Sequence, residues 1–387
     1  MPQSAEFGLL LEACADPPDL TRLKLSCLQL HGEQWPTLLS LADAHGVTSL
    51  LHLALAQISG LAVPADFVGA LEKGYSTNVH KSLLQARELS RVLDALDTTG
   101  ITVIPYKGLL LSELAYGDLA IRQAGDIDLL VRKQDLSRAK AVVEKLGFSA
   151  CLDLTETELD RYLAVGYELT FDYGNHRNLL ELKWGIVPRF YSADFDMEAM
   201  FAARTQLGFA GRRVNTLALE DLFLVLCMHA AKHCWSRLIW LCDISRLLTR
   251  PSLDWPAVCQ KARELGISRI VGVTIGLVNQ MPGMESPATP TGFHGNDLDT
   301  EMLTREVREH IVSGKSPNPE SLAYFQLMIR LRERTSDRIR FALRLAFTPG
   351  PNEWKAVKLW GYMAPLYRVV RMARLGARIG RMGSLRR

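Results

Sequence analysis

Residues 105–131, PYKGLLLSELAYGDLAIRQAGDIDLLV, decide the fold of this chain. The β-branched run Ile101–Pro105 predicts a short strand that leads into this stretch, and a helix is predicted from Lys107 to about Tyr116. Asp126–Val131 (DIDLLV) predicts a second strand, because it is apolar except for two carboxylates at its entry. A strand, a helix and a strand in succession indicate a small α/β centre.

Asp126 and Asp128 are the first candidates for chemistry. Residues two apart in a strand point to the same face, with Cα atoms ~6.6 Å apart, while Ile127 points to the opposite face and into the core. Two carboxylates placed in this way can share a hard divalent cation with the oxygens of a bound triphosphate. The alternative is a pair of surface acids at a strand edge, following the turn at Gly125.

Glu181 is a third candidate, because it is the one acid in the apolar run LLEL of a strand predicted over Asn178–Trp184. A glutamate in such a strand is costly unless it is paired or bound to a metal. The alternative is that Glu181 faces water or pairs with Lys183, two residues further on and on the same face.

Lys107 and Gly108 close the first strand and open the helix. A helix N-terminus presents free N–H groups and the positive end of the helix dipole, which suits phosphate. Gly108 allows close approach of the backbone, and Lys107 adds a point charge.

The rest of the chain surrounds this centre with helices. Asp135 is predicted to cap a helix that ends at Gly147. Tyr167–Asp172 and Asn178–Trp184 predict two strands joined by a turn at Gly174 and Asn175. Gln206–Phe209 and Arg213–Thr216 predict a hairpin. Helices are predicted throughout the first ~100 residues and over Glu220–Trp235, Arg237–Leu248, Trp255–Leu265 and Ile267–Asn279, with loops at Pro282–Asp297 and Ser313–Pro319.

We therefore expect an α+β fold, with a small mixed-sheet core flanked by N- and C-terminal helical segments. The expected segments are residues 1–98 (helical), 99–217 (α/β core), 218–350 (helical domain) and 351–387 (basic tail).

Composition excludes several classes of protein. The 387 residues are 48% hydrophobic and 22% charged, which is typical of a globular chain and not of a disordered one. No apolar run approaches the ~18 residues of a membrane span, and no basic segment precedes the first apolar stretch. We expect a cytoplasmic protein. It would lie at the periphery of the membrane only if its basic tail binds there.

Charge is concentrated in the tail. The net charge is +3, but residues 351–387 hold nine basic residues and one acid. The remaining body is slightly acidic, which argues against nucleic-acid binding. The tail arginines recur at helical spacing and predict a basic stripe with an apolar back, suited to an anionic membrane or a polyanion: Arg368, Arg371, Arg374, Arg378 and Arg381. The alternative is a packed terminal helix with a solvated basic face.

His229 and His233 lie four residues apart on a predicted helix and therefore share a face. They line a cleft beside Lys232 in one interpretation and form a hydrogen-bonded core pair in the other.

In order, these motifs resemble the nucleotidyltransferase superfamily with the DNA-polymerase-β-like fold, whose pattern is hG[GS], [DE]h[DE]h and a later h[DE]h. More closely, the chain resembles a bacterial nucleotidyltransferase family found near exopolysaccharide and lasso-peptide biosynthesis genes. The resemblance runs over roughly residues 40–375, in the stretches LADAHGVTSLLHLAL, YKGLLLSELAYGD, IRQAGDIDLLV, LLELKW, LALEDLFLVLCMHAAKHCWSRLIWLCDISRLL and FALRLAFTPG…LYRVVRMARL.

The resemblance implies a role for each matching residue. Asp126 and Asp128 would hold Mg²⁺ (or Mn²⁺) against the phosphates of a nucleoside triphosphate, and Glu181 would complete a two-metal site and help to deprotonate the acceptor. Lys107 and Gly108 would cradle the leaving pyrophosphate. Three further residues would contact the nucleotide or line its cleft: Arg122, Lys183 and His233.

Two residues depart from the family pattern. Leu109 stands where the superfamily has a second small, hydroxylated residue, and Lys183 stands where many relatives carry a histidine before the tryptophan. The gap of 18 residues from Gly108 to Asp126 is also longer than usual.

The expected function is Mg²⁺-dependent transfer of a nucleoside monophosphate from a nucleotide donor to an acceptor such as a peptide, sugar or protein. Two alternatives are a glycosyltransferase that uses a sugar nucleotide, and a nucleotide-binding scaffold without activity.

Overall fold

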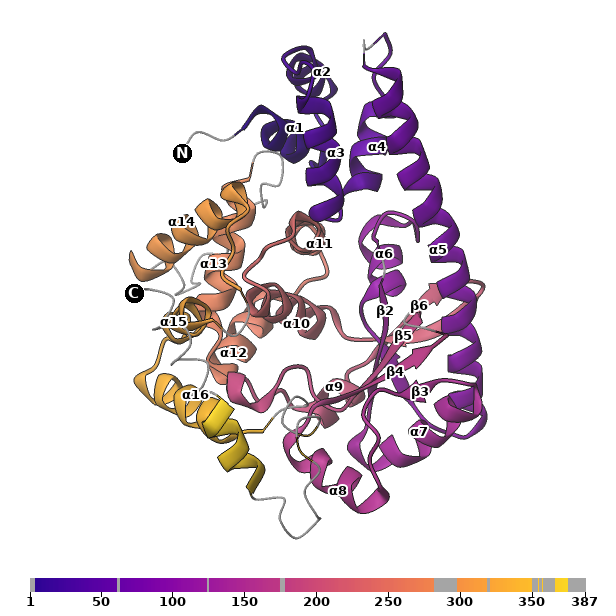
Figure 1. Cartoon of the computed structure of the whole chain (residues 1–387), viewed down its shortest axis with the longest axis vertical. Helices are drawn as coiled ribbons and strands as arrows, with labels where there is room; N and C mark the ends of the chain where they lie inside the picture. The colour runs from indigo at the N-terminus through magenta and orange to yellow at the C-terminus, as the bar shows by residue number, and fades with distance from the viewer. Residues whose placement is uncertain are drawn as a thin grey trace.

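Five strands form one mixed sheet in the order β1-β2-β5-β4-β3. In the computed structural model, the described residues are 4–60, 63–123, 125–174, 178–281, 298–318, 321–349, 354, 357 and 366–374. The strands are β1 (Val103–Pro105), β2 (Asp126–Val131), β3 (Ser149–Ala150), β4 (Glu168–Tyr173) and β5 (Asn178–Lys183). This sheet and the helices around it confirm the expected α+β fold (Figure 1).

The register of the sheet determines which side chains meet. β2 runs parallel to β5 and places Asp128 beside Glu181, whereas the other pairings are antiparallel. β4 places Glu168 beside Lys183. Because side chains alternate between the two faces of a strand, these four polar side chains lie on one face. Leu129, Leu180 and Leu182 are fully buried on the other.

A separate hairpin of β6 (Thr205–Phe209) and β7 (Arg212–Thr216) lies against β1, where Asn215 donates a hydrogen bond to the Val103 carbonyl at 3.5 Å. This hairpin agrees with the sequence-based prediction and begins one residue earlier in each strand. Strand β3 and the helices α8 (Glu156–Val165) and α9 (Met197–Ala202) were not predicted.

The N-terminal segment is helical, as expected. Its longest helix, α5, runs beside the small N-terminal helices and continues along the sheet (Figure 1). Leu89, Val92 and Leu96 near its end belong to the apolar core of the sheet, whereas Phe67 and Leu71 near its start belong to the helical core. The helices are α1 (Ala5–Ala13), α2 (Leu20–Leu28), α3 (Gln34–Ala44), α4 (Thr48–Ala56) and α5 (Ala65–Thr98).

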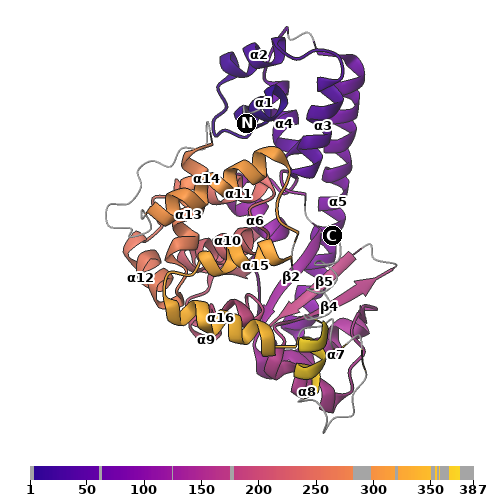
Figure 2. The same cartoon turned by 60° about the vertical axis from the view of Figure 1, so that its left-hand side comes forward.

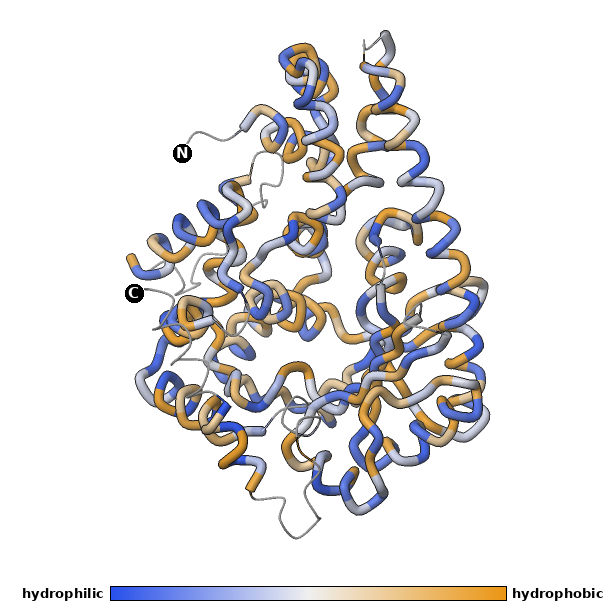
Figure 3. The backbone as a smooth tube through the Cα atoms, viewed as in Figure 1, coloured by the Kyte–Doolittle hydropathy of each residue, from blue (hydrophilic) through white to orange (hydrophobic). Residues whose placement is uncertain are grey.

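Helices also separate the first four strands of the sheet along the chain. Further helices build the C-terminal half, which packs beside the sheet (Figure 2). Figure 3 shows hydrophobic residues concentrated along α10 and hydrophilic ones along the outer helix α14. The remaining helices are α6 (Gly108–Tyr116), α7 (Leu136–Lys145), α9 (Met197–Ala202), α10 (Leu219–Lys232), α11 (Leu238–Leu248), α12 (Trp255–Leu265), α13 (Ser268–Asn279), α14 (Leu298–Ser313), α15 (Leu322–Arg330) and α16 (Thr335–Phe347), with 3-10 turns at Lys133–Asp135 and Arg189–Tyr191.

The predicted cap at Asp135 is wrong. Asp135 precedes α7, but its side chain makes no capping hydrogen bond and instead pairs with Arg138 at 3.1 Å. A 3-10 turn at this point leads directly into the helix, so Asp135 lacks the extended backbone of a capping residue. The three boundaries between the four predicted segments stay predictions, and the predicted loop at Pro282–Asp297 lies outside the described residues.

The described part of the tail differs from the predicted basic stripe. Residues 367–374 are helical, but Arg371 is buried and donates to the Leu345 carbonyl at 3.3 Å, while Val369 and Met372 are exposed. Arg378 and Arg381 lie outside the described residues. Among the helices that the structure describes, none is long and apolar enough to cross a membrane.

A buried histidine joins the N-terminal helices to α11. His45 follows α3, its Nδ1 accepts a hydrogen bond from the Leu238 N–H at 3.4 Å, and its carbonyl accepts one from Ile239 at 3.2 Å. Burial, with a smaller effect from the charge of Arg237, lowers the pKa of His45 to about 4. His45 is therefore neutral in the folded chain at pH 5, whereas it is largely protonated in the unfolded chain.

We expect His45 to make folding less stable in acid. Its folded pKa is depressed, so the unfolded chain binds more protons and stability falls as the pH drops below about 6.5. Between pH 7 and pH 5, urea unfolding should show His45→Asn losing about 1–2 kcal/mol less stability than the wild type. The exposed His31→Asn is the control and should follow the wild type; equal slopes for His45→Asn would refute the prediction.

An ion pair fixes the long connection between α6 and β2. The Arg122 Nε donates to Asp243 of α11 at 3.0 Å, and both side chains are buried. The hydroxyl of Tyr116 donates to the other oxygen of Asp243 at 2.9 Å, and Arg122 also donates to the Gly108 carbonyl at 3.2 Å.

Asp243→Asn should strongly destabilise the chain, because it leaves the buried charge of Arg122 uncompensated. The expected loss is about 3–5 kcal/mol in the free energy of unfolding, measured by chemical denaturation. The double variant Asp243→Asn/Arg122→Met should recover much of this loss. If the single and double variants are equally unstable, the ion pair is not what fixes this connection.

Candidate active site

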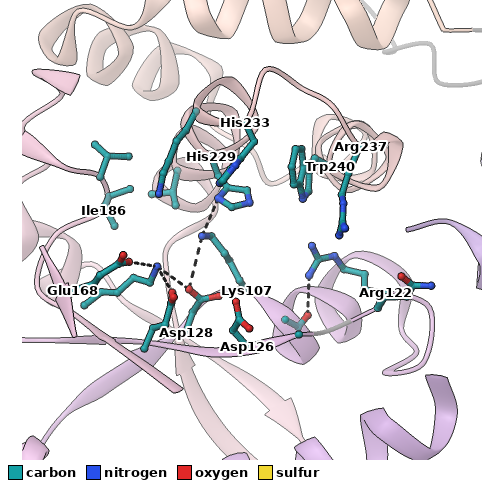
Figure 4. Close-up of a pocket in the computed structure, with 18 residues that line it drawn as sticks. Lys107, Arg122, Asp126, Asp128, Glu168, Ile186, His229, His233, Arg237 and Trp240 are labelled. Atoms are coloured by element: carbon teal, nitrogen blue, oxygen red, sulfur yellow. Dashed lines mark hydrogen bonds and ion pairs between the residues drawn. The ribbon is translucent and has the colours of Figure 1, made fainter. Parts of the chain in front are cut away.

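A cavity of about 350 Å³ lies between the polar face of the sheet and helices α10 and α11 (Figure 4). All eight predicted site residues border it, from four separate stretches of the chain. Its lining comprises Lys107, Gly108, Arg122, Gln123, Gly125, Asp126, Asp128, Glu168, Glu181, Lys183, Ile186, Val187, Val225, His229, Lys232, His233, Arg237 and Trp240.

Lys183 is the most enclosed charge of this cavity. Its Nζ lies 2.6 Å from Glu181 Oε2, 2.9 Å from Glu168 Oε2 and 3.1 Å from Asp128 Oδ1. The side chain is 6% exposed. The pairing of Lys183 with Glu181 is the alternative that the sequence left open, and Asp128 and Glu168 join the same ammonium group.

The carboxylates keep Lys183 charged. Burial opposes its charge, but the negative charges of Asp128, Glu168 and Glu181 raise the pKa of Lys183 well above its ordinary value. Burial likewise opposes the charge of Asp128, and the two nearby ammonium groups, Lys107 and Lys183, lower the pKa of Asp128 to about 2. This part of the site is thus ionised at neutral pH.

Glu181 differs from Asp128 in this respect. Burial raises the pKa of Glu181 to about 7, with the neighbouring charges of Glu168 and Asp128 acting in the same direction and Lys183 opposing them. A carboxylate whose pKa lies near neutrality can accept a proton and release it again at cellular pH.

Asp126 is exposed to the cavity without a partner. It makes no ion pair or hydrogen bond with any residue that the structure describes. Burial and the charge of Asp128 raise its pKa. Two adjacent carboxylates, one of them unpartnered, are the hard oxygen ligands that Mg²⁺ prefers, so Asp126 and Asp128 suit a divalent cation. Within the described ranges, however, no three His, Cys, Asp or Glu side chains form a group that could hold a metal by themselves.

The start of α6 borders the same cavity. Gly108 has φ +57°, a backbone conformation that favours glycine, and no side chain caps the first turn of the helix. Lys107 Nζ donates to His229 Nδ1 at 3.1 Å and lies 3.9 Å from Asp128 Oδ1. Burial lowers the pKa of Lys107 to about 8, against the opposing effect of Asp128.

His229 and His233 face the cavity together, with ring centroids 4.8 Å apart and both rings against Trp240 (Figure 4). Burial and the nearby lysines lower the pKa of both histidines, that of His233 to about 3. Both rings are therefore neutral, and their shared helical face agrees with the spacing of four.

Arg122 borders the cavity but is already committed to Asp243. The carboxylate of Asp243 binds both Arg122 and Tyr116. The Arg122 guanidinium thus joins the start of α6 to α11 at the edge of the cavity.

Sequence reasoning missed Glu168, whose carboxylate also accepts a 2.5 Å hydrogen bond from the Tyr167 hydroxyl. Tyr167 in turn accepts one from Lys232 at 3.3 Å. A signal was present in YELTFD, where Glu168 alternates with apolar residues; antiparallel pairing with NLLELK would then place it opposite Lys183.

A second cavity of about 550 Å³ continues from the first and shares Gln123, Gly125 and Arg237 with it. Its other wall is α5, which contributes Lys73, Thr77 and Lys81. The site is therefore a charged cavity beside a larger groove lined by α5.

Three solved structures are similar: the antibiotic-resistance factor ANT(2'')-Ia in solution (18% identity, 50% of this chain and 90% of that chain, TM-score 0.30), ANT(2'')-Ia in complex with adenylyl-2''-tobramycin (17%, 49% and 93%, 0.28), and a nucleotidyltransferase-like protein from Paracoccidioides brasiliensis (14%, 57% and 96%, 0.32). A search of curated proteins found no match.

The sequence profile of a family described as "uncharacterised nucleotidyltransferase" matches residues 31–283. This range includes the whole sheet, the start of α6 and the histidines of α10. Because the match covers more than half of the chain, the chain belongs to this nucleotidyltransferase family.

Proposed function

We propose that the chain catalyses Mg²⁺-dependent transfer of a nucleoside monophosphate from a nucleoside triphosphate to an acceptor. The observation that carries this proposal is the placement of Asp126 and Asp128 side by side on one face of β2, next to the uncapped start of α6. Membership of a nucleotidyltransferase family favours this reaction over transfer from a sugar nucleotide and over a scaffold without activity.

Asp126 and Asp128 would hold the divalent cation, which when bound neutralises phosphate charge. Lys107 and the first turn of α6 would hold the outer phosphates, since both present positive charge to the cavity. An acceptor oxygen forms a bond to the α-phosphorus, and the bond from that phosphorus to the β-phosphate oxygen breaks. Pyrophosphate leaves with the electron pair, and the acceptor proton passes to Glu181, whose pKa of about 7 suits a base.

We place the acceptor in the groove along α5. This groove joins the catalytic cavity at Gln123 and Gly125, and Lys73, Lys81 and Arg237 give it a basic lining. Such a lining favours an acceptor that carries a negative charge, whether on a peptide, a sugar or a protein.

The first test is binding of ATP, GTP, CTP and UTP, each with Mg²⁺ or with EDTA, measured by thermal shift and calorimetry. One triphosphate with Mg²⁺ should raise the Tm by several degrees, because it binds only the folded chain. Asp126→Asn/Asp128→Asn should weaken this binding at least ~10-fold, which corresponds to about 1.4 kcal/mol. Asp160→Asn, an exposed carboxylate of α8, is the matched control. Equal binding by the double variant and the control would contradict the proposal.

Lys107→Met should test whether the Lys107 ammonium group contacts the outer phosphates of the bound triphosphate. Removing its charge should weaken the preferred triphosphate about 10-fold and leave the corresponding nucleoside monophosphate nearly unaffected, because only the triphosphate carries outer phosphates. Competition calorimetry measures both dissociation constants, with the exposed Lys133→Met as control. A loss of affinity that is equal for the two nucleotides would exclude a contact between Lys107 and the outer phosphates.

A further inference from the structure

One ammonium group occupies the centre of the carboxylate cluster. Glu181, Glu168 and Asp128 each place an oxygen 2.6–3.1 Å from Lys183 Nζ, and they come from three adjacent strands. An exposed lysine rarely holds three partners in this way, whereas this one is almost wholly buried. Three carboxylates surround a positive charge, as they do in a metal site, but here that charge is the ammonium group of a lysine side chain.

The position of this ammonium is informative. Two-metal sites hold their ions ≈3.5–4 Å apart on shared carboxylates. Asp128 is shared in the same manner here, because it faces Lys183 and also adjoins the unpartnered Asp126. Glu181, which would bind a second ion, already contacts Lys183 at 2.6 Å. A divalent ion bound to Glu181 and Asp128 would meet the ammonium at close range, and the two positive charges would repel each other.

We propose that the ammonium of Lys183 takes the place of a second divalent ion, so that the chain binds one divalent cation, at Asp126 and Asp128. This inference rests on the proposed function for the identity of the first site. Lys183 is then a resident cation that keeps Asp128, Glu168 and Glu181 together without metal.

Replacing a second metal ion by an ammonium group has a chemical consequence. An ammonium group neutralises one carboxylate charge and donates hydrogen bonds, but it binds no water as a Lewis acid. Lys183 therefore orients Asp128 toward the first cation, while activation of the acceptor is left to a carboxylate. Lys183 acts as a positioning residue, because its contacts are with carboxylates rather than with the reacting atoms.

The test counts bound Mn²⁺ on the full chain by electron paramagnetic resonance, without nucleotide. The wild type should bind one Mn²⁺, and Lys183→Met should bind two, because it removes the positive charge that repels a metal and frees the oxygens of Asp128, Glu168 and Glu181 to move onto one. Two ions ≈4 Å apart should also broaden the six-line signal through coupling. Lys232→Met is the matched control, since Lys232 borders the same cavity but bonds to the Tyr167 hydroxyl, and it should still bind one.

Two comparisons separate this inference from the proposed function. The inference depends on the extra ion in Lys183→Met; equal counts in that variant and the wild type would overturn it, as would two ions in the wild type. The proposed function depends on the ion that Asp126→Asn should remove. If Asp126→Asn binds as many ions as the wild type, the first site is wrong. The assignment of Lys183 still stands in that case if Lys183→Met gains an ion.

Lys183→Met leaves three carboxylates close together and could weaken folding. In Lys183→Met/Glu168→Gln one of these charges is removed, while Asp128 and Glu181 stay available for an ion. Millimolar Mn²⁺ should raise the Tm of this double variant by more degrees than that of Glu168→Gln alone, because metal bound to the folded state stabilises it. Equal shifts in these two variants would overturn the inference independently of the count.

Discussion

The parallel pairing of β2 with β5 is the constraint on which the site depends. Its register sets Asp128 beside Glu181, and a slip by one residue would turn one strand's acids to the opposite, fully apolar face. The buried leucines of both strands oppose such a slip, because each would have to leave the core. The apolar core on one face of the sheet therefore fixes the positions of the charged groups on the other face.

Concentrating carboxylates on one face costs free energy through mutual repulsion, and the site offsets this cost with its own lysines. Lys183 lies among three acids, and Lys107 lies near Asp128 and hydrogen-bonds to a neutral histidine. Only Asp126, among the acids that border the cavity in the described part of the chain, lacks such a partner. Each of the other three acids of the cavity thus has a lysine ammonium group beside it.

The helices around the sheet hold this network in place from a distance. The ion pair of Arg122 with Asp243 ties the start of α6 to α11, and His45 ties the N-terminal helices to the same helix. Helix α11 therefore connects the side of the cavity formed by Lys107 and Gly108 to the wall of the groove under α5. An acceptor in that groove would lie against elements that these buried contacts position.

The sequence by itself determined the elements and the chemical candidates. The alternation in Asp126–Val131 and Asn178–Lys183 and the glycine at the start of α6 identify strands and a helix N-terminus, because these patterns act over only a few residues. The order of the motifs carried the resemblance to a nucleotidyltransferase family, and the family match agrees with it. Only the tertiary structure decided the partners. Glu168 joins the site through antiparallel pairing, Arg122 pairs with Asp243 from a helix 121 residues away, and Lys183 meets three carboxylates at once. Such contacts depend on which strands pair and on packing between distant segments, and the local sequence pattern of one segment does not specify its partner.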